Sequence, residues 1–358
     1  MGDAVGLRDE WAGALAGVET GGRAVRLWLY GLVALVILMV AIGGATRLTG
    51  SGLSITEWKP VTGAIPPFSD TAWAAEFEKY RASSQYQNLN RGMALDEFKT
   101  IYWWEWSHRQ LGRFLGFYFF LPLIFFWWRG RVTSRLALTL IGIGALGGLQ
   151  ATVGWIMVAS GLEPGMTAVA PLKLMLHLII ASGILALIVW VAAGLNPIRE
   201  RGACRGIAAA SAALVALILV QIALGGLVAG SRAGWTYNTW PLMDGRFVPD
   251  PAAMFSGVPG IENFVDNPLL VQFNHRIVAY LVVLAALWHA FAARDRGAAA
   301  GRAGLVAGLA LAQAALGIGT LVLVVPLWAG LSHQLLAMAL LAVTVHHARR
   351  SRLESRAL

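Results

Sequence analysis

The sequence has few charged residues and almost no cysteine. Charged residues make up 13% of the 358 residues, hydrophobic residues make up 57%, and the mean hydropathy is +0.63. This balance excludes an ordinary soluble domain and indicates an integral membrane protein. The single cysteine, Cys204, excludes an intramolecular disulfide and a metal cluster built on cysteines. The net charge of +9 does not indicate nucleic-acid binding, because the arginines lie in short loops and the C-terminal tail.

The N-terminal segment also lacks the apolar core of a signal peptide. Residues 1–24 are polar and carry Asp9 and Glu10, so we expect no cleavable leader here. This segment is predicted to be a cytoplasmic N-terminal tail.

Eight apolar runs are long enough to cross a bilayer, which takes about 20 helical residues. The predicted fold class is therefore all-α, a polytopic membrane protein with eight transmembrane helices. Arginines crowd the loops after the second, fourth and sixth runs, so the positive-inside rule places both termini in the cytoplasm. The segments 47–100 and 230–267 then lie outside and are expected to be ordered caps. The runs are 25–46, 101–128, 136–159, 169–194, 206–229, 268–292, 303–325 and 328–347.

The two halves of the chain repeat each other. His108 recurs as His275, and His177 recurs as His333, in the same order along the chain. Weaker matches pair Gly43 with Gly225, Gly44 with Gly226, Trp58 with Trp240, Gln150 with Gln313, and Gly154 with Gly317. Four spans per half give both halves one orientation, so we expect two four-helix bundles related by a pseudo-twofold axis along the membrane normal. The predicted units are a tail at 1–24, halves at 25–200 and 201–348, and a cytoplasmic tail at 349–358.

The same four histidines lie at one predicted depth, roughly 10 Å below the outer surface at about 1.5 Å of rise per residue. A lone histidine in a membrane helix is more often a hydrogen-bonding partner of another helix than a ligand. Four at one depth, in repeat-related pairs, instead favour paired imidazoles that hold a haem iron from both sides. His289, His346 and His347 are expected to be interfacial histidines at the cytoplasmic ends.

One acid distinguishes the two halves. The stretch 102–113, YWWEWSHRQLGR, places Glu105 three residues before His108 and on the same helix face, whereas the second half has Gln272 there. Zinc would need more close ligands, and a di-iron site would need more glutamates. A cofactor in one half and a reacting substrate in the other would explain the difference. The alternative makes Glu105 a helix-terminus charge, stabilised by the helix dipole.

Outer-side arginines form the last candidate group. Haem propionates would need such cationic partners, and contact with lipid headgroups explains each arginine equally well. The candidates are Arg47, Arg109, Arg232 and Arg276.

In these features the sequence resembles the heme A synthase family. The resemblance covers about 25–348. The lack of a cysteine pair in the outer loops resembles the family branch without that disulfide, so a thiol redox relay through these loops is in doubt here. The matching stretches are GGATRLTGSGLSITEWKPVTGAIPP at 43–67, YWWEWSHRQLGR at 102–113, LMLHL at 174–178, NTWPLMDG at 238–245, FNHR at 273–276 and LSHQ at 331–334.

The resemblance implies an enzyme of the bacterial inner membrane that serves cytochrome oxidase assembly. It would oxidise a ring methyl of haem O to a formyl group, giving haem A. The resemblance implies haem b, an iron cofactor, on His275 and His333. It implies haem O, supplied by a haem O synthase, near His108 and His177, with Glu105 at the acidic position.

Several partners and alternatives accompany this expectation. Membrane lipid, an electron-transfer partner and further copies of the chain are expected as partners, and nucleic acid is not. A di-haem b-type cytochrome that only passes electrons is the alternative function. A transporter is a third, suggested by the repeat.

Overall fold

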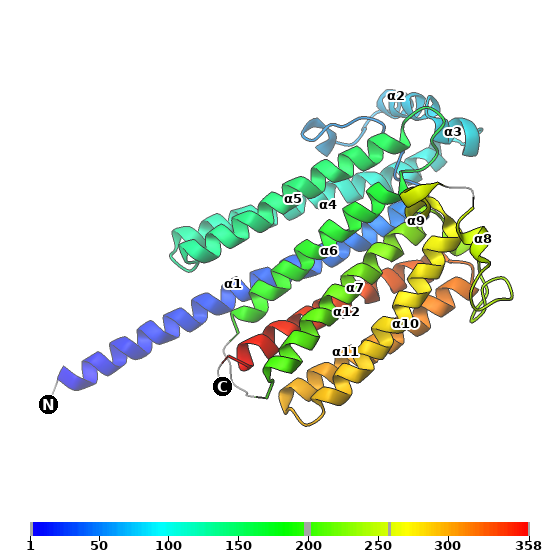
Figure 1. Cartoon of the computed structure of the whole chain (residues 1–358). Coiled ribbons are helices and arrows are strands. Elements are labelled where there is room, and N and C mark those ends of the chain that lie inside the picture. Colours follow the sequence, from blue (N-terminus) through cyan, green and yellow to red (C-terminus); the bar gives the residue numbers. More distant parts are fainter. Residues whose placement is uncertain (1–2, 197–201, 257–258, 357–358) are drawn as a thin grey trace.

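The computed structural model describes residues 3–196, 202–256 and 259–356, with side chains from residue 22 onward. Across these ranges the chain is helical and contains no strand. Eight helices are long and apolar enough to cross a membrane, which confirms the predicted all-α membrane fold (Figure 1). They are α1 (Asp3–Leu48), α4 (Leu95–Trp128), α5 (Ser134–Gly161), α6 (Pro171–Gly194), α7 (Arg205–Gly230), α10 (Pro268–Ala293), α11 (Ala298–Val322) and α12 (Leu327–Glu354).

Three of these helices extend well beyond the predicted apolar runs. The segment expected as an N-terminal tail is mostly helical, because α1 already begins at Asp3, and α12 runs on to Glu354. Helix α4 begins at Leu95, six residues before the predicted start of its run. Asp96 and Glu97 occupy its first turn, where negative charge is favourable, and the Glu97 carboxylate accepts a hydrogen bond from the backbone of Ala94. Polar residues therefore begin α4 before its apolar run, which is why a prediction from the apolar run alone made this helix too short.

The two halves share one hydrophobic core. Helix α6 packs against α7 and α12, and α1 packs against α6 and α12, so these four helices form the centre of the bundle. All eight long helices contribute buried apolar side chains to this core. The first and last helices also meet directly, because Gln334 donates a hydrogen bond to the backbone oxygen of Val40 over 3.2 Å. Helices α4 and α5 contact each other much less than α10 and α11 do.

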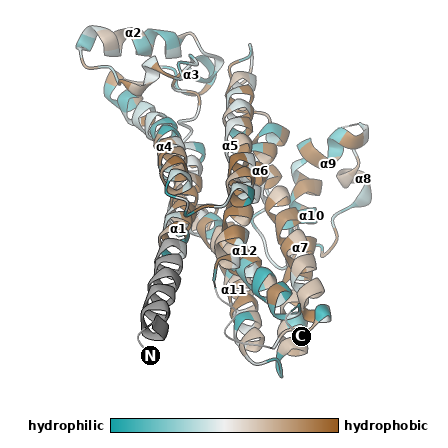
Figure 2. Cartoon of the chain, turned by 90° about the vertical axis from the view of Figure 1, so that its left-hand side faces the viewer, coloured by the Kyte–Doolittle hydropathy of each residue, from teal (hydrophilic) through white to brown (hydrophobic). Residues whose placement is uncertain are grey.

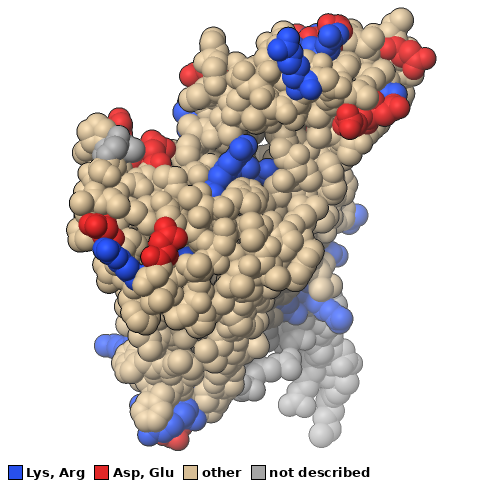
Figure 3. All heavy atoms as spheres, turned by 90° about the vertical axis from the view of Figure 1, so that its right-hand side faces the viewer, with Lys and Arg blue, Asp and Glu red and all other residues tan. Residues whose placement is uncertain are grey.

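Both long connections form ordered caps, as predicted. The connection between α1 and α4 contains α2 (Asp70–Arg81) and α3 (Ser84–Leu89), whose aromatic side chains pack on the start of α4. The connection between α7 and α10 contains the short helices α8 (Pro251–Met254) and α9 (Asn263–Asp266). The caps are more polar than the long helices (Figure 2). On the face in Figure 3, acidic side chains gather at the capped end.

Candidate functional site

Each of the four candidate histidines packs against a glycine of the long helix that precedes its own. His108 lies on α4, His177 on α6, His275 on α10 and His333 on α12. Glycine permits this close approach, because a Cβ at the same position would crowd the ring. An ideal Cβ would lie 3.0 Å from His108 if placed on Gly43, 2.8 Å from His177 on Gly154, 3.2 Å from His275 on Gly225, and 2.7 Å from His333 on Gly317.

The histidines come together as two pairs, one in each half. The rings of His108 and His177 interact electrostatically, and so do those of His275 and His333. All four histidine residues are partly buried. Nδ1 of His177 is buried without a hydrogen-bond partner among the described residues. Two imidazoles per half, each held against a helix backbone, are a donor set that fits axial ligation of a haem iron.

Glutamines support three of these four histidines. Each lies four residues before the glycine that contacts the ring, so glutamine and glycine share a helix face. The carbonyl oxygens of all three glutamines are buried and have no partner within the described ranges. The amide nitrogen donates to the backbone oxygen of the histidine over 2.9 Å for Gln150 and His177, 3.1 Å for Gln221 and His275, and 3.0 Å for Gln313 and His333.

Glu105 is buried, with 3% of its surface exposed, and both of its oxygens are occupied. One oxygen accepts hydrogen bonds from the Ser54 hydroxyl and the Ile55 amide, each over 2.8 Å. The other accepts from Arg109 over 2.6 Å. The helix-terminus alternative is wrong, because Glu105 lies in the third turn of α4 and dipole effects fade within the first turn. The carboxylate instead ties the outer connection to the helix that carries His108.

Gln272 makes the corresponding tie in the second half without a charge. Its amide donates to the backbone oxygen of Ala233 over 2.8 Å, and its carbonyl accepts from Arg276 over 2.8 Å. Arg276 stands four residues further along α10, just as Arg109 stands four residues after Glu105 on α4. The anchoring contact thus exists in both halves, whereas the negative charge exists in one.

One of the predicted propionate partners, Arg109, binds the connection between α1 and α4. Arg109 donates to the backbone oxygens of Ile55 and Glu57, each over 2.9 Å. The Glu57 side chain is itself held by hydrogen bonds from Lys59 and Lys79, which lower its pKa to about 2. A segment pinned in this way gives the site a fixed outer wall.

The remaining candidates keep more capacity for an anion. Arg276 binds the oxygen of Tyr237, and Arg47 donates to the oxygen of Ala229 over 2.7 Å. The Nε atoms of Arg47 and Arg276 are buried and find no partner in the described ranges. Arg47 also lies within electrostatic reach of the exposed Arg232. Two adjacent cations and a spare donor favour an anionic group at the outer junction of the two halves.

The expectation of interfacial histidines is wrong for two of the remaining three. His289 and His347 are 1% and 0% exposed, and their Nε2 atoms share a hydrogen bond of 2.8 Å. Arg302 contacts the other ring nitrogen of His347 and forms a two-pronged ion pair with Glu354. A buried polar network of this kind was not visible in the sequence, because its members come from three helices. His346 is only partly buried.

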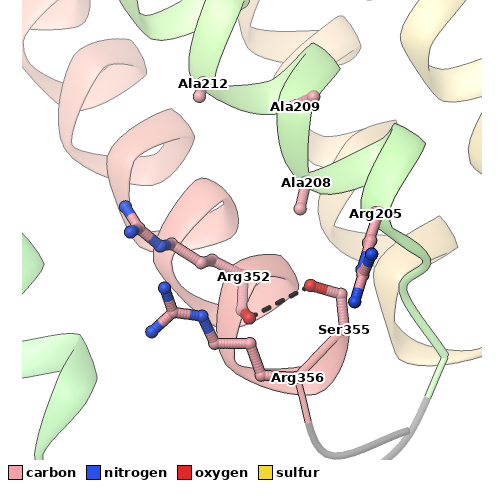
Figure 4. A pocket seen from close by; sticks show the side chains of 7 residues that line it. All are labelled: Arg205, Ala208, Ala209, Ala212, Arg352, Ser355 and Arg356. Atoms are coloured by element: carbon pink, nitrogen blue, oxygen red, sulfur yellow. Dashed lines mark hydrogen bonds between the residues drawn. The ribbon is translucent and has the colours of Figure 1, made fainter.

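A cavity of about 450 Å³ lies away from the four histidines, between the beginning of α7 and the end of α12 (Figure 4). Its walls combine alanines with arginines at the end of the bundle opposite the caps. It therefore belongs to the basic rim of the bundle and not to the histidine site. The lining residues are Arg205, Ala208, Ala209, Ala212, Arg352, Ser355 and Arg356.

Comparison with known proteins relates nearly the whole chain to one family. The family model described as cytochrome oxidase assembly protein matches residues 26–345. The chain is 62% identical to the heme A synthase of Methylobacterium sp. (strain 4-46), over 91% of each chain. It is 49% identical to the heme A synthase of Parvibaculum lavamentivorans, over 94% of this chain and 97% of the relative. The identity to the heme A synthase of Brucella ovis is 48%, over 91% of each chain.

Proposed function

The chain belongs to the cytochrome oxidase assembly family that includes the heme A synthases, and on this basis we propose how its two histidine pairs divide the work. It is a haem-dependent oxidoreductase of a bacterial membrane that makes haem A from haem O. In our proposal His275 and His333 hold a resident haem b, while His108 and His177 hold haem O. The ring methyl of haem O is oxidised to a formyl group, through a hydroxymethyl stage.

One observation carries the assignment of two haem sites. Two imidazoles meet in each half, and each is seated on a glycine where any side chain would reach the ring. Helix packing alone does not require a histidine to contact a glycine, and this contact occurs at all four candidate histidines. Ligands that must keep a fixed orientation toward an iron do need such a seat.

The chain contributes ligation, orientation and charge. The haem on His275 and His333 would supply the redox chemistry. The helices that carry the two histidine pairs share one hydrophobic core. Glu105 keeps a negative charge one helical turn from His108, near the edge of a haem held there. Because both of its oxygens already accept hydrogen bonds, one of them from the Arg109 cation, we assign Glu105 to stabilising positive charge and not to accepting a proton.

The differences between the halves favour this enzyme over a di-haem cytochrome. Two haems that only pass electrons could have identical surroundings. In this chain the position of Glu105 in the first half is occupied by Gln272 in the second half. A transporter is disfavoured as well, because all eight spans are continuous helices.

We further propose that both termini are cytoplasmic and that the caps lie outside, because the short loops opposite the caps carry the arginines. The two halves, 25–200 and 201–348, are then related by a pseudo-twofold axis along the membrane normal. Oxidation of haem O also requires a partner that accepts electrons, and association with further copies of the chain belongs to the same proposal.

A haem analysis in cells tests the function directly. The chain is expressed in cells that make haem O but no haem A, and extracted haems are separated by chromatography and identified by mass. We expect haem A with the wild-type chain and haem O alone with His108→Ala or His275→Ala. Haem A that persists in either variant would overturn the division of the two sites.

A further inference from the structure

We propose that the cavity between the beginning of α7 and the end of α12 binds the headgroup of an anionic membrane phospholipid. The cavity lies at the end of the bundle opposite the caps, away from the four histidines. The proposal therefore goes beyond the proposed function. Only the assignment of the lipid to the cytoplasmic leaflet rests on the proposed orientation.

Three cations line this cavity, and no acidic residue lines it. Arg205 comes from the first turn of α7, whereas Arg352 and Arg356 come from the end of α12 and the residues just after it (Figure 4). All three residues are exposed, and none of them forms an ion pair within the described ranges. With a volume of about 450 Å³, the cavity is large enough for a small ligand. Its charge favours a ligand with a phosphate group.

The acid nearest to these arginines in the sequence is already paired. Glu354 lies between Arg352 and Arg356, but it is 0% exposed and accepts hydrogen bonds from Arg302 of α11 over 2.7 and 2.9 Å. Its negative charge is therefore used inside the bundle. Arg349 lies within electrostatic reach of both Arg352 and Arg356, so α12 ends in a row of mutually repelling cations. An anion bound among them would relieve this repulsion.

The α7 wall of the cavity continues as a face of small apolar residues. Ala209, Ala212, Ala216 and Val220 follow Arg205 at spacings of three and four, so they share its helix face, and all four are exposed. The exposed faces of α4 and α10 carry phenylalanine, leucine and tryptophan, whereas Val220 is the one large apolar residue that is exposed on α7. Alanines leave room for an acyl chain along the helix. A cation followed by an apolar face matches a phospholipid, whose charged headgroup is followed by hydrocarbon.

Trp190 of α6 indicates that the arginines lie at headgroup depth. The guanidinium carbons of Arg349 and Arg352 lie 4.9 and 5.7 Å from the centre of its ring. Tryptophan is enriched at the membrane–water interface, and a cation over its face is held in place. Basic pockets between membrane helices on the cytoplasmic side bind anionic headgroups. A membrane lipid therefore fits this cavity better than a soluble phosphate, which would leave the alanine face uncovered.

The first half of the chain provides a matched control. The repeats that relate the glycines and histidines of the two halves also pair Arg205 with Arg23, and Arg352 with the uncharged Asn196. Arg23 is exposed as well. The first half thus has one of these cations without the second, and we expect no lipid site there.

Lipid binding to the purified full-length protein tests the proposal. The protein is stripped of lipid in detergent and mixed with phosphatidylglycerol or phosphatidylcholine of the same acyl chains, and bound lipid is counted by native mass spectrometry. We expect tighter binding of phosphatidylglycerol. Each arginine removed in Arg352→Ala and Arg356→Ala should weaken this binding about fivefold, as loss of one cation beside an anionic headgroup does. Arg23→Ala should leave the binding unchanged.

A second variant keeps every arginine in place. Ala209→Phe fills the space beside the cavity, at an exposed position where the fold tolerates a larger side chain, and should also weaken binding of phosphatidylglycerol. Equal binding of the two lipids, binding that survives both arginine substitutions, or an equal loss in Arg23→Ala would overturn the proposal. Soluble glycerol phosphate that binds as tightly as phosphatidylglycerol, with no effect of Ala209→Phe, would show a site for a free anion and reject the lipid. Haem A production in cells is a separate measurement, so its failure would reject the proposed function and not this site.

Discussion

At the scale of single residues, Glu105 combines two tasks that can be separated. Its hydrogen bonds from Ser54, Ile55 and Arg109 tie the connection between α1 and α4 to α4, and its carboxylate lies on the helix that carries His108. The second half performs the first task with Gln272. An amide can therefore anchor a connection of this kind, and the charge is what the first half adds.

Substitution of Glu105 should separate the two tasks. Glu105→Ala removes the carboxylate that Ser54, Ile55 and Arg109 share as an acceptor. It should cost roughly 3–5 kcal/mol of stability, as loss of one partner of a buried ion pair does. Glu105→Gln keeps an oxygen for Ser54 and Ile55, so the protein should retain its C-terminal haem b. It should nevertheless accumulate haem O or its hydroxylated form. Thermal unfolding and haem chromatography measure the two effects, and abundant haem A from Glu105→Gln would reject a need for the charge.

The sequence draws attention to the candidate site residues more readily than to their hydrogen-bond partners. The four histidines and Glu105 stand out because ionisable groups are rare in apolar runs. Ser54 could not be found in this way, since it lies 51 residues from Glu105 and the contact depends on the path of the connection. Gln221 was missed because its repeat mate is Met39, so no match in the sequence drew attention to it.

At the scale of helices, a glycine defines how closely two spans approach. Gly317 of α11 faces the ring of His333 on α12, whereas Gly319 of the same helix has no neighbour within 4 Å. The two positions therefore form a matched pair for testing the close approach.

Gly317→Ala should displace the His333 ring and lower the haem b content of the purified protein. Overpacking of this kind costs about 1–3 kcal/mol. Gly319→Ala should leave the haem content unchanged. The ratio of haem absorbance to protein gives the result, and equal haem content in the two variants would contradict a tight seat for His333.

Orientation in the membrane is a second property of whole elements. With Cys204 first replaced, a cysteine at Ser134 should resist an impermeant thiol reagent in intact cells, and a cysteine at Ala82 should react. Both positions are exposed. The neighbouring Ser83 is left unchanged, because its side chain caps α3. Reaction at position 134 and protection at position 82 would reverse the proposed orientation.

Helix existence was predictable and helix length was not. Apolar runs locate the spans because a bilayer demands them. The start of α4 was placed too late and the end of α12 too early, because charged residues extend both helices beyond the apolar runs. The weak packing between α4 and α5 also escaped prediction, since both helices, like their counterparts α10 and α11, are long and apolar enough to cross a membrane.

At the scale of the whole molecule, one core holds two separate histidine pairs. Replacing either His275 or His333 by Ala should remove most of the low-spin b-type absorbance, because each would supply one axial ligand to the proposed haem b. His108→Ala should leave that absorbance in place, since its pair lies in the other half. Reduced-minus-oxidised spectra of the purified variants decide this, and unchanged haem in both His275→Ala and His333→Ala would exclude these ligands.

The contact between the first and last spans has a consequence for how the protein is made. Val40 and Gln334 are separated by 294 residues. At about 5–20 residues per second, a ribosome needs roughly 15–60 s to synthesise the chain between them. During that time the face of α1 that will meet α12 is covered only by lipid or by the insertion machinery. A nascent chain that stops before residue 327 therefore leaves its oldest helix with an unfilled face, which membrane proteases can recognise.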